Sequence, residues 1–179
     1  MTESQLIEDC RKQDRRAQKA LYDRYSRAMF TTTYRIMGNA DLAAEALQDG
    51  FLRVFTHIGA FEGRSTLGAW IKKIMVRTAI DMLRKKRVLT ESFEESHDSQ
   101  APDPGMEAID AEYLEKAILQ LPEGYRAIFL LAEVEGYTHR EIAVLLDISE
   151  GTSKSQLWNA KKRLRELLAR QTNFQTTGS

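Results

Sequence analysis

Cysteine, histidine and proline are scarce in this chain. The single cysteine, Cys10, excludes an intramolecular disulfide, and we interpret it as a half-buried helix residue rather than a nucleophile. The three histidines, His57, His97 and His139, have no paired cysteine or second histidine nearby, so we expect no zinc site. The sequence also lacks a P-loop, a dinucleotide-binding glycine motif and a nucleophile elbow. It therefore predicts neither a metal, nor a cofactor, nor an enzyme.

Long apolar runs are missing as well. No stretch approaches the length of a membrane-spanning helix, and no secretory signal precedes the first polar segment. We therefore expect a cytoplasmic protein without membrane insertion. An apolar content of 42% over 179 residues is enough for one domain or two small ones.

The net charge is zero, but this zero is a cancellation between unlike segments. Residues 1–90 hold 17 Lys and Arg against 10 Asp and Glu, and residues 91–118 hold 1 against 9. Residues 119–179 are nearly balanced, with 8 against 7. Such asymmetry says more about partners than the total does. A basic front segment of this kind is compatible with nucleic-acid binding despite the neutral total.

The acidic middle is also where the helical pattern stops. Residues 90–106 are rich in Ser, Asp, Glu and Pro and have no apolar period, which is the composition of a flexible linker. We predict two small domains at 1–88 and 107–170, joined by a flexible acidic linker at 89–106 and followed by a polar tail at 171–179.

Helical periodicity accounts for the front domain. The pattern predicts a short helix at about 2–12, a long helix from the N-cap Asp14 to Gly38, a third helix capped by Asp41, and a fourth from Thr66 to about Arg87. The apolar face of the fourth helix is expected to comprise Leu67, Ile71, Ile74, Met75, Thr78 and Met82. No segment alternates with period two for long enough to be a strand, so the predicted class is all-α.

Residues 137–158 have the pattern of a helix-turn-helix. Ile142, Leu145 and Leu146 supply the apolar face of the first helix, and Ser149 is a good N-cap for the second. The apolar face of the second helix is expected to comprise Leu157, Ala160, Leu164, Leu167 and Leu168. The opposite face is polar, basic or aromatic, and major-groove reading requires such a face. An ordinary helical hairpin with a solvated face is the alternative, but an exposed Trp158 favours a partner.

The order of these helices and motifs resembles the group IV, or extracytoplasmic-function (ECF), sigma factors of bacterial RNA polymerase over about residues 4–169. The blocks that carry the resemblance are DLAAEALQDGFLRVF at 41–55, FEGRSTLGAWI at 61–71, RTAIDMLRKKR at 77–87, and LPEGYR at 121–126 followed by the helix-turn-helix. The resemblance implies that the two domains are sigma regions 2 and 4. It also implies a protein that directs core polymerase to promoters and melts them by recognising the −10 and −35 elements.

The family's partners follow from the same resemblance. They are the β′ clamp helices and the β flap of core polymerase, duplex DNA at −35 and single-stranded DNA at −10. Many members are held inactive by an anti-sigma factor, which is a further candidate partner. The resemblance assigns core binding to Glu45, Gln48 and Asp49, which share a helix face by their spacing. Two carboxylates and an amide suit a basic partner surface, and a solvated acidic face is the alternative.

The resemblance also implies a −10 site. The loop 61–66 offers backbone donors, a glycine and hydroxyl groups, which suit a pocket for an unstacked base. The implied −10 residues are Phe61, Arg64, Ser65 and Thr66 in the loop, with Lys73, Arg77, Arg84 and Lys85 holding phosphates. Trp70 is expected to pack in the core rather than stack on DNA. A helix end that only improves solubility is the alternative for the basic run 84–87.

The −35 positions lie on the second helix of the helix-turn-helix. The implied −35 residues are Lys154, Ser155, Trp158 and Asn159 at base edges, with Thr152, Lys161 and Lys162 at phosphates. Asn159 stands where arginine is common in the family, and asparagine pairs with adenine whereas arginine favours guanine. The preferred −35 sequence is therefore expected to be unusual.

Other departures from the family pattern concern packing. Ser153 stands where valine is usual, and Asp147 where glycine is frequent, although aspartate tolerates the left-handed conformation. Gly50 and Gly68 replace larger apolar residues, and each is expected to cost up to ~1 kcal/mol of helix stability relative to alanine.

Two questions stay open at this point. A self-sufficient helix-turn-helix regulator is the alternative function, although no sustained heptad or ligand domain is visible. The acidic linker, especially Glu91, Glu94, Glu95 and Asp98, is hypothesised to lie against the basic helix ending at Arg87 and to compete with DNA. A solvated spacer is the alternative for the linker.

Overall fold

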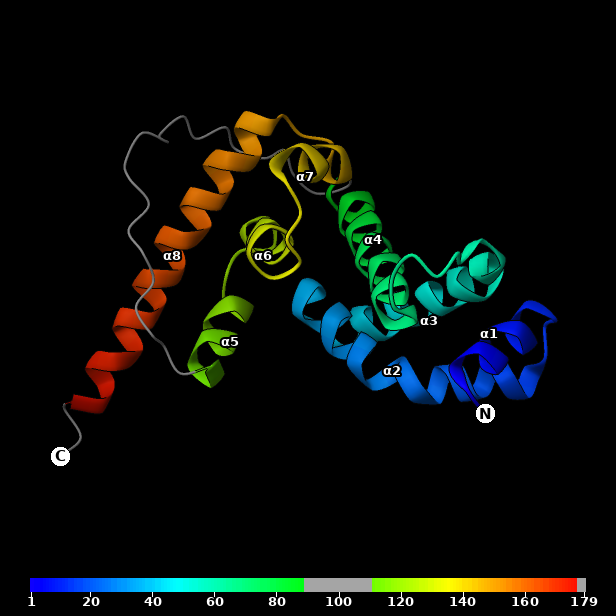
Figure 1. Ribbon diagram of the computed structural model, residues 1–179. Helices are drawn as coiled ribbons and strands as arrows, with labels where there is room; N and C mark the ends of the chain where they lie inside the picture. The colour runs from blue at the N-terminus through cyan, green and yellow to red at the C-terminus, as the bar shows by residue number, and fades with distance from the viewer. Residues whose placement is uncertain (89–110, 177–179) are drawn as a thin grey trace. The chain divides into compact units, whose positions relative to one another are not determined.

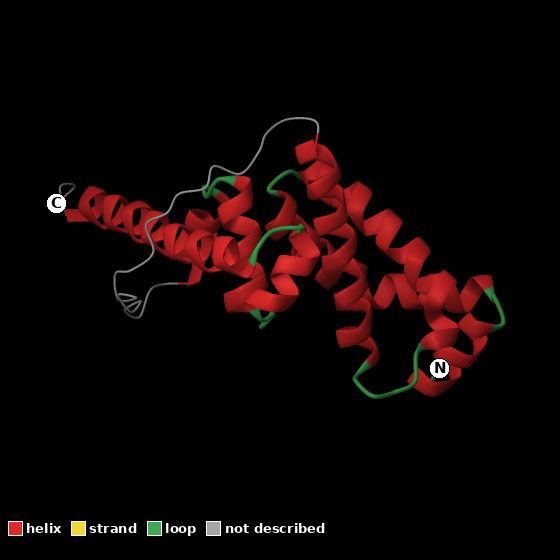
Figure 2. Cartoon of the chain, turned by 90° about the horizontal axis from the view of Figure 1, so that it is seen from above, coloured by secondary structure: helices red, strands yellow, loops and turns green. Residues whose placement is uncertain are grey.

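The computed structural model describes residues 1–88 and 111–176, with side chains over 1–86 and 111–170. Within these ranges every regular element is a helix and none is a strand (Figure 2), which confirms the predicted all-α class. The chain divides into two units, Met1–Lys86 and Arg87–Ser179, which are described separately (Figure 1). The predicted linker at 89–106, with its hypothesised contact to the basic helix, lies outside the described residues.

Unit 1 contains five helical segments. They are α1 (Glu3–Arg11), α2 (Arg15–Met37), α3 (Ala40–His57), the short 3₁₀ helix η1 (Ile58–Ala60) and α4 (Leu67–Val88). Helix α2 packs along α3 and α1, and η1 contacts both α1 and α3. A loop at 61–66 then leads into α4, so the predicted −10 loop lies directly between two packed segments.

Local polar groups explain where α1 and α2 begin. Thr2 accepts a hydrogen bond from the backbone of Gln5, and Asp14 accepts from the first turn of α2. Both side chains satisfy N–H groups that have no partner inside the helix. Gly38 ends α2 with φ 65°, a left-handed conformation that glycine adopts without strain. These boundaries agree with the prediction.

The start of α3 corrects the prediction. Its N-cap is Asn39, whose Oδ1 accepts from the backbone N–H of Leu42 at 3.0 Å. Asp41 lies inside the first turn instead, where its negative charge still interacts favourably with the helix dipole. The prediction of Asp41 as the cap is wrong because the helix begins at Ala40, almost directly after the left-handed Gly38.

The core of unit 1 draws on all four of its α-helices. It includes Leu6 and Cys10 of α1, Leu21 of α2, Phe51 and Val54 of α3, and Leu67, Ile71 and Met75 of α4. On the predicted apolar face of α4, Ile74 and Met82 are half-buried and the other residues are buried. Cys10 is fully buried rather than half-buried, and burial raises the pKa of its thiol. This supports a packing role for Cys10, since the thiolate is the nucleophile.

Unit 2 contains the helix-turn-helix. Its segments are α5 (Ala111–Leu119), α6 (Glu123–Phe129), the π-helical turn η2 (Leu130–Val134), α7 (His139–Leu146) and α8 (Glu150–Thr176). Helix α8 packs against α5, α6 and α7. Because α8 continues to Thr176, the segment predicted as a polar tail begins as helix. The core of this unit includes Ile128, Leu131, Ile142, Leu146, Ala160, Leu164 and Leu168.

The turn between α7 and α8 has the predicted chemistry. Thr138 and Glu141 form a reciprocal capping box at the start of α7. Asp147 ends α7 with φ 55° and donates its backbone N–H to Ala143. Ser149 then caps α8 by accepting from Thr152 N at 2.9 Å. The helix-turn-helix prediction is confirmed.

A buried arginine joins α5 to α6. Arg126 is 6% exposed and donates through Nη1 to the carbonyl oxygens of Leu121 at 3.1 Å and Leu119 at 3.4 Å. Carbonyl groups at a helix end lack partners within the helix, so this guanidinium satisfies them from the next helix. The contact fixes how the chain enters α6.

Candidate polymerase and nucleic-acid interfaces

The outer face of α3 carries the three residues expected to bind core polymerase. Glu45, Gln48 and Asp49 are all exposed. In the part of the chain that the structure describes, their side chains make no hydrogen bond or ion pair. Four carboxylate oxygens and an amide are therefore available to a basic partner.

An apolar residue on the same face was missed by the sequence analysis. Leu52 follows Asp49 by three positions and Gln48 by four, so it lies on the same side of α3. Its side chain is 65% exposed. An exposed apolar side chain with polar and acidic groups around it matches the arrangement of a docking surface, which has an apolar centre and a polar rim. Its helical spacing from Gln48 and Asp49 is the signal that could have identified it.

The predicted −10 loop is anchored at its two ends. Phe61 is 7% exposed, and its ring centroid lies 5.5 Å from that of Trp70. At the other end Thr66 Oγ1 accepts from the backbone N–H of Ala69 at 3.2 Å and so caps α4. Trp70 packs against the core of the unit, as predicted. Because the Phe61 ring is buried, it holds the end of the loop against the core and is not accessible to a DNA base.

The tip of the loop, residues 62–65, is exposed. Gly63 has φ 74°, which a side chain at this position would strain. Arg64 and Glu62 form an ion pair with an N–O distance of 2.6 Å, and both side chains are largely solvated. An exposed pair contributes little to stability, so separating Arg64 from Glu62 costs little free energy.

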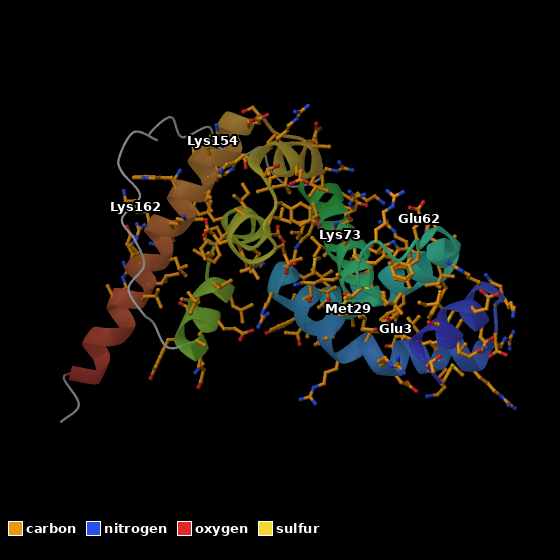
Figure 3. All side chains as sticks on the ribbon, in the orientation of Figure 1. Glu3, Met29, Glu62, Lys73, Lys154 and Lys162 are labelled. Carbon is orange, nitrogen blue, oxygen red and sulfur yellow. The ribbon has the colours of Figure 1, made fainter. Side chains whose placement is uncertain are left out.

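A basic stripe, defined here as Lys73, Arg77 and Arg84, continues from the loop along α4. These three residues are spaced so that they fall on one side of the helix, over about 16 Å, and all three are exposed. Lys85 is exposed beside the stripe. Figure 3 marks Lys73 on α4 and Glu62 at the loop tip. The predicted phosphate contacts therefore lie along the helix that follows the loop.

One acidic residue interrupts this basic surface. Asp81 accepts from Arg53 of α3 at 2.9 Å and lies 3.7 Å from a guanidinium nitrogen of Arg84. No role was predicted for Asp81 or Arg53. The pair links α3 to α4, and the weaker contact places a carboxylate beside the positive charge of Arg84.

The outward face of α8 carries the predicted base-reading residues. Lys154 is exposed, and Ser155 and Asn159 are half-buried. Lys162 places its Nζ 5.4 Å from the centroid of the Trp158 ring, and Figure 3 marks Lys154 and Lys162 on this helix. Trp158 is half-buried rather than exposed, and its Nε1 is buried with no hydrogen-bond partner among the described residues.

Two predicted phosphate contacts are engaged within unit 2. Lys161 Nζ lies 3.0 Å from Glu133 Oε1 of η2, and the lysine side chain is only 17% exposed. The Thr152 hydroxyl is hydrogen-bonded to Ser149 Oγ at 2.8 Å. A phosphate contact by Lys161 would have to replace a partly buried ion pair. The structure therefore favours Lys162 over Lys161 for that role.

A buried polar pair connects the two helices of the helix-turn-helix. Ser153 is fully buried, and its Oγ lies 2.8 Å from Nδ1 of His139 on α7. Buried hydroxyl groups are hydrogen-bonded in folded proteins, and His139 provides the partner that the family's usual valine does not need. Burial first, and then the positive charge of Lys154, lower the pKa of His139. From the sequence, Ser153 was only a departure from the family pattern, and no role was predicted for His139.

No group of three His, Cys, Asp or Glu residues within the described ranges could hold a metal ion. No helix in these ranges is long and apolar enough to cross a membrane.

Comparisons with known proteins identify the family. The family model described as Sigma-70 region 2 matches residues 21–88, and the model described as Sigma-70, region 4 matches residues 111–164. Together they match more than half of the chain, and the two matched segments do not overlap.

Individual relatives agree with these matches. The ECF RNA polymerase sigma factor SigE of Mycolicibacterium smegmatis is 31% identical over 154 residues, which are 79% of this chain and 58% of that protein. The ECF RNA polymerase sigma factor SigW of Bacillus subtilis is 25% identical over 90% of this chain and 94% of that protein. The sigma factor RpoE of Bartonella quintana, solved in complex with the anti-sigma factor NepR, has the same fold. Its TM-score is 0.51 at 22% identity, and the match covers 84% of this chain and 96% of that chain. The chain therefore belongs to the sigma-70 family and, within it, to the ECF sigma factors.

Proposed function

We propose that this chain is a specificity subunit of bacterial RNA polymerase that acts in the cytoplasm, selects promoters and assists in melting them without catalysing a reaction itself. Unit 1 docks on core polymerase through α3 and holds the −10 element through its loop and α4. Unit 2 reads the −35 element through α8. The roles of single residues, given below, follow from this division of labour between the two units.

One observation carries the proposal. Unit 1 combines a free acidic face on α3, made by Glu45, Gln48 and Asp49, with the basic stripe on α4. Acidic groups suit a basic protein surface, and basic groups suit DNA phosphates. A subunit that joins polymerase to promoter DNA needs both surfaces in one domain. We assign the acidic face to the β′ clamp helices.

At −10 the proposed ligand is single-stranded. The exposed tip 62–65 receives an unstacked base, and Lys73, Arg77, Arg84 and Lys85 follow the backbone of the same strand. At −35 the proposed ligand is duplex DNA, with Lys154, Ser155, Trp158 and Asn159 directed to base edges. Unit 2 also contacts the β flap in this proposal, and Lys162 contacts a phosphate.

We further propose regulation by an anti-sigma factor. The support is fold-level, because the solved relative with the same fold is an RpoE protein bound to NepR. Such a partner would prevent promoter use by covering the acidic face of α3, the basic stripe of α4 or the outward face of α8.

The experiment that tests the function is promoter-dependent transcription with purified core polymerase and this chain. We expect transcripts only when both are present, and no stable complex between duplex DNA and the free chain. A self-sufficient helix-turn-helix regulator would instead bind duplex DNA alone and would give no transcripts with core. That result would replace the proposed function by the alternative.

A further inference from the structure

The first residue of the −10 loop is held by an arginine from the first helix of the unit. Arg11, the last residue of α1, donates through Nη2 to the carbonyl oxygen of Phe61 at 2.8 Å in a partly buried contact. Its other guanidinium nitrogen lies 3.7 Å from Glu8 on the same helix. Helix α1 also packs against η1, which leads into the loop. Residues 3–11 precede the segment matched by the region 2 model, which begins at residue 21.

The arginine completes a set of anchors around an exposed tip. The Phe61 ring packs on Trp70, and Thr66 caps α4. Between these two ends, residues 62–65 are exposed and include the left-handed Gly63. A short loop held at both ends samples few conformations, and a binding site that is already ordered loses less entropy when its ligand binds.

We propose that Arg11 is a positioning residue for the −10 loop. By holding the Phe61 carbonyl, it keeps the tip 62–65 in the conformation that receives an unstacked base of the promoter strand. Arg11 acts through Phe61 and does not itself touch DNA or core polymerase. The proposal rests on the proposed function, because it assumes that the loop reads a base. It makes α1 a part of promoter recognition.

The carbonyl contact is the feature to remove. Arg11→Met keeps a long apolar stem that can still pack on η1, but it removes every donor. Arg11→Lys keeps one charged donor with a shorter reach. Arg16→Met is the matched control, because it makes the same exchange at an exposed arginine near the start of α2.

The readout is base discrimination by the assembled holoenzyme. Single-stranded −10 oligonucleotides with an intact base or an abasic site at each position are compared for affinity. We expect wild type to discriminate at one position or more, and Arg11→Met to lower that discrimination about tenfold, the factor of one charge-assisted hydrogen bond. Core affinity should stay at the wild-type value, and the unfolding temperature should fall only by the few degrees that one hydrogen bond contributes. Arg11→Lys should recover part of the loss, and Arg16→Met should match wild type.

Three results would overturn the proposal. Wild-type discrimination in Arg11→Met would show that the tip does not depend on this contact. An equal loss of core affinity and discrimination would show that Arg11 supports the unit as a whole. If the wild-type holoenzyme transcribes but discriminates nowhere, the −10 role of the loop itself is wrong, whereas absence of transcription would reject the proposed function instead.

Discussion

The sulfur atom of Met75 occupies the place where a Cβ on residue 50 would lie. Gly50 is buried in α3, and Met75 of α4 is fully buried against it. Gly50 stands where the family has a larger residue, and the long side chain of Met75 from the facing helix fills the space that this residue would take. The loss of helix propensity at Gly50 is offset by packing of Met75.

The contact between Gly50 and Met75 predicts that the effect of Gly50→Ala on the free energy of unfolding depends on the residue at position 75. Gly50→Ala should lower the free energy of unfolding by about 1 kcal/mol, because overpacking costs about 1–3 kcal/mol and alanine returns at most ~1 kcal/mol of helix propensity. In a Met75→Ala background the same change should be neutral or stabilising. Urea unfolding followed by Trp70 fluorescence, with Trp158 replaced by Phe, measures both. Equal effects in the two backgrounds would show that the residues do not compete for space.

Charge reversal on α3 should separate folding from docking. Glu45→Arg combined with Asp49→Arg should abolish core binding, because like charges would then face the basic partner. The fold should persist, since both side chains are exposed and make no contact that the described residues reveal. The control is Glu3→Arg with Asp23→Arg, which changes the net charge equally at exposed positions of α1 and α2. Wild-type core affinity in the α3 variant would reject the docking assignment.

Leu52 should contribute to docking without contributing to folding. Leu52→Ala should weaken core binding by more than about 1 kcal/mol, as truncation of an apolar anchor commonly does. The unfolding temperature should not change, because the side chain is 65% exposed. Val144→Ala is the control, since Val144 is 75% exposed on unit 2. Equal core affinities for the two variants would exclude Leu52 from the interface.

The outward face of α8 should divide into base readers and phosphate contacts. Replacing Lys154 or Asn159 should change the −35 preference, with a loss of about 1–3 kcal/mol at the base that is read. Replacing Lys162 should weaken binding evenly across sequences. It should also reduce the slope of log affinity against log salt concentration by about one. Holoenzyme binding to a panel of −35 variants at several salt concentrations separates the two patterns. An unchanged preference in Asn159 variants would remove it from the base-reading set.

The His139–Ser153 pair predicts a pH dependence of stability. The pKa of His139 is lowered below 6.5 by burial and then by Lys154, with Lys161 acting in the same direction and Glu150 and Glu133 opposing it. As the pH falls below about 6.5, the unfolded chain takes up a proton that the folded unit does not, so the free energy of unfolding should decrease. It should be highest above this range, where His139 is neutral in both states.

Unfolding of unit 2 from pH 5 to 8, followed by Trp158 fluorescence with Trp70 replaced by Phe, measures this slope. His139→Gln should remove the part of the slope that comes from this residue. His57→Gln, at an exposed position of unit 1, should leave it unchanged. If the free energy of unfolding of the His139 variant keeps the same dependence on pH, that dependence comes from other groups.

Contacts within one or two helical turns were accessible to sequence reasoning. Asp14 and Ser149 cap their helices through hydrogen bonds that span two or three residues, so spacing alone indicates them. Asp41 was misplaced because Asn39 offers equivalent chemistry two positions earlier, and only the end of α2 decides between them.

Contacts over longer separations were not accessible. Arg11 reaches Phe61 across 50 positions, and Lys161 is paired with Glu133 through the packing of η2 beside α8. In both cases tertiary packing decides which polar group a charged side chain meets. For the same reason, burial of Phe61 and half-burial of Trp158 could not be read from their positions in the motifs.

The π-helical turn η2 holds one residue more than an α-helical turn would. Its wider hydrogen bonds, such as Glu135 N to Leu130 O at 2.9 Å, accommodate more residues per turn than an α-helix does. Deleting Glu133 would therefore favour an ordinary α-helical turn and leave the flanking residues close to their present orientation. The deletion would also remove the carboxylate that pairs with Lys161 and make the surface beside the proposed −35 residues more positive. We expect such a deletion in η2 to raise the non-specific DNA affinity of unit 2 without any change in α8.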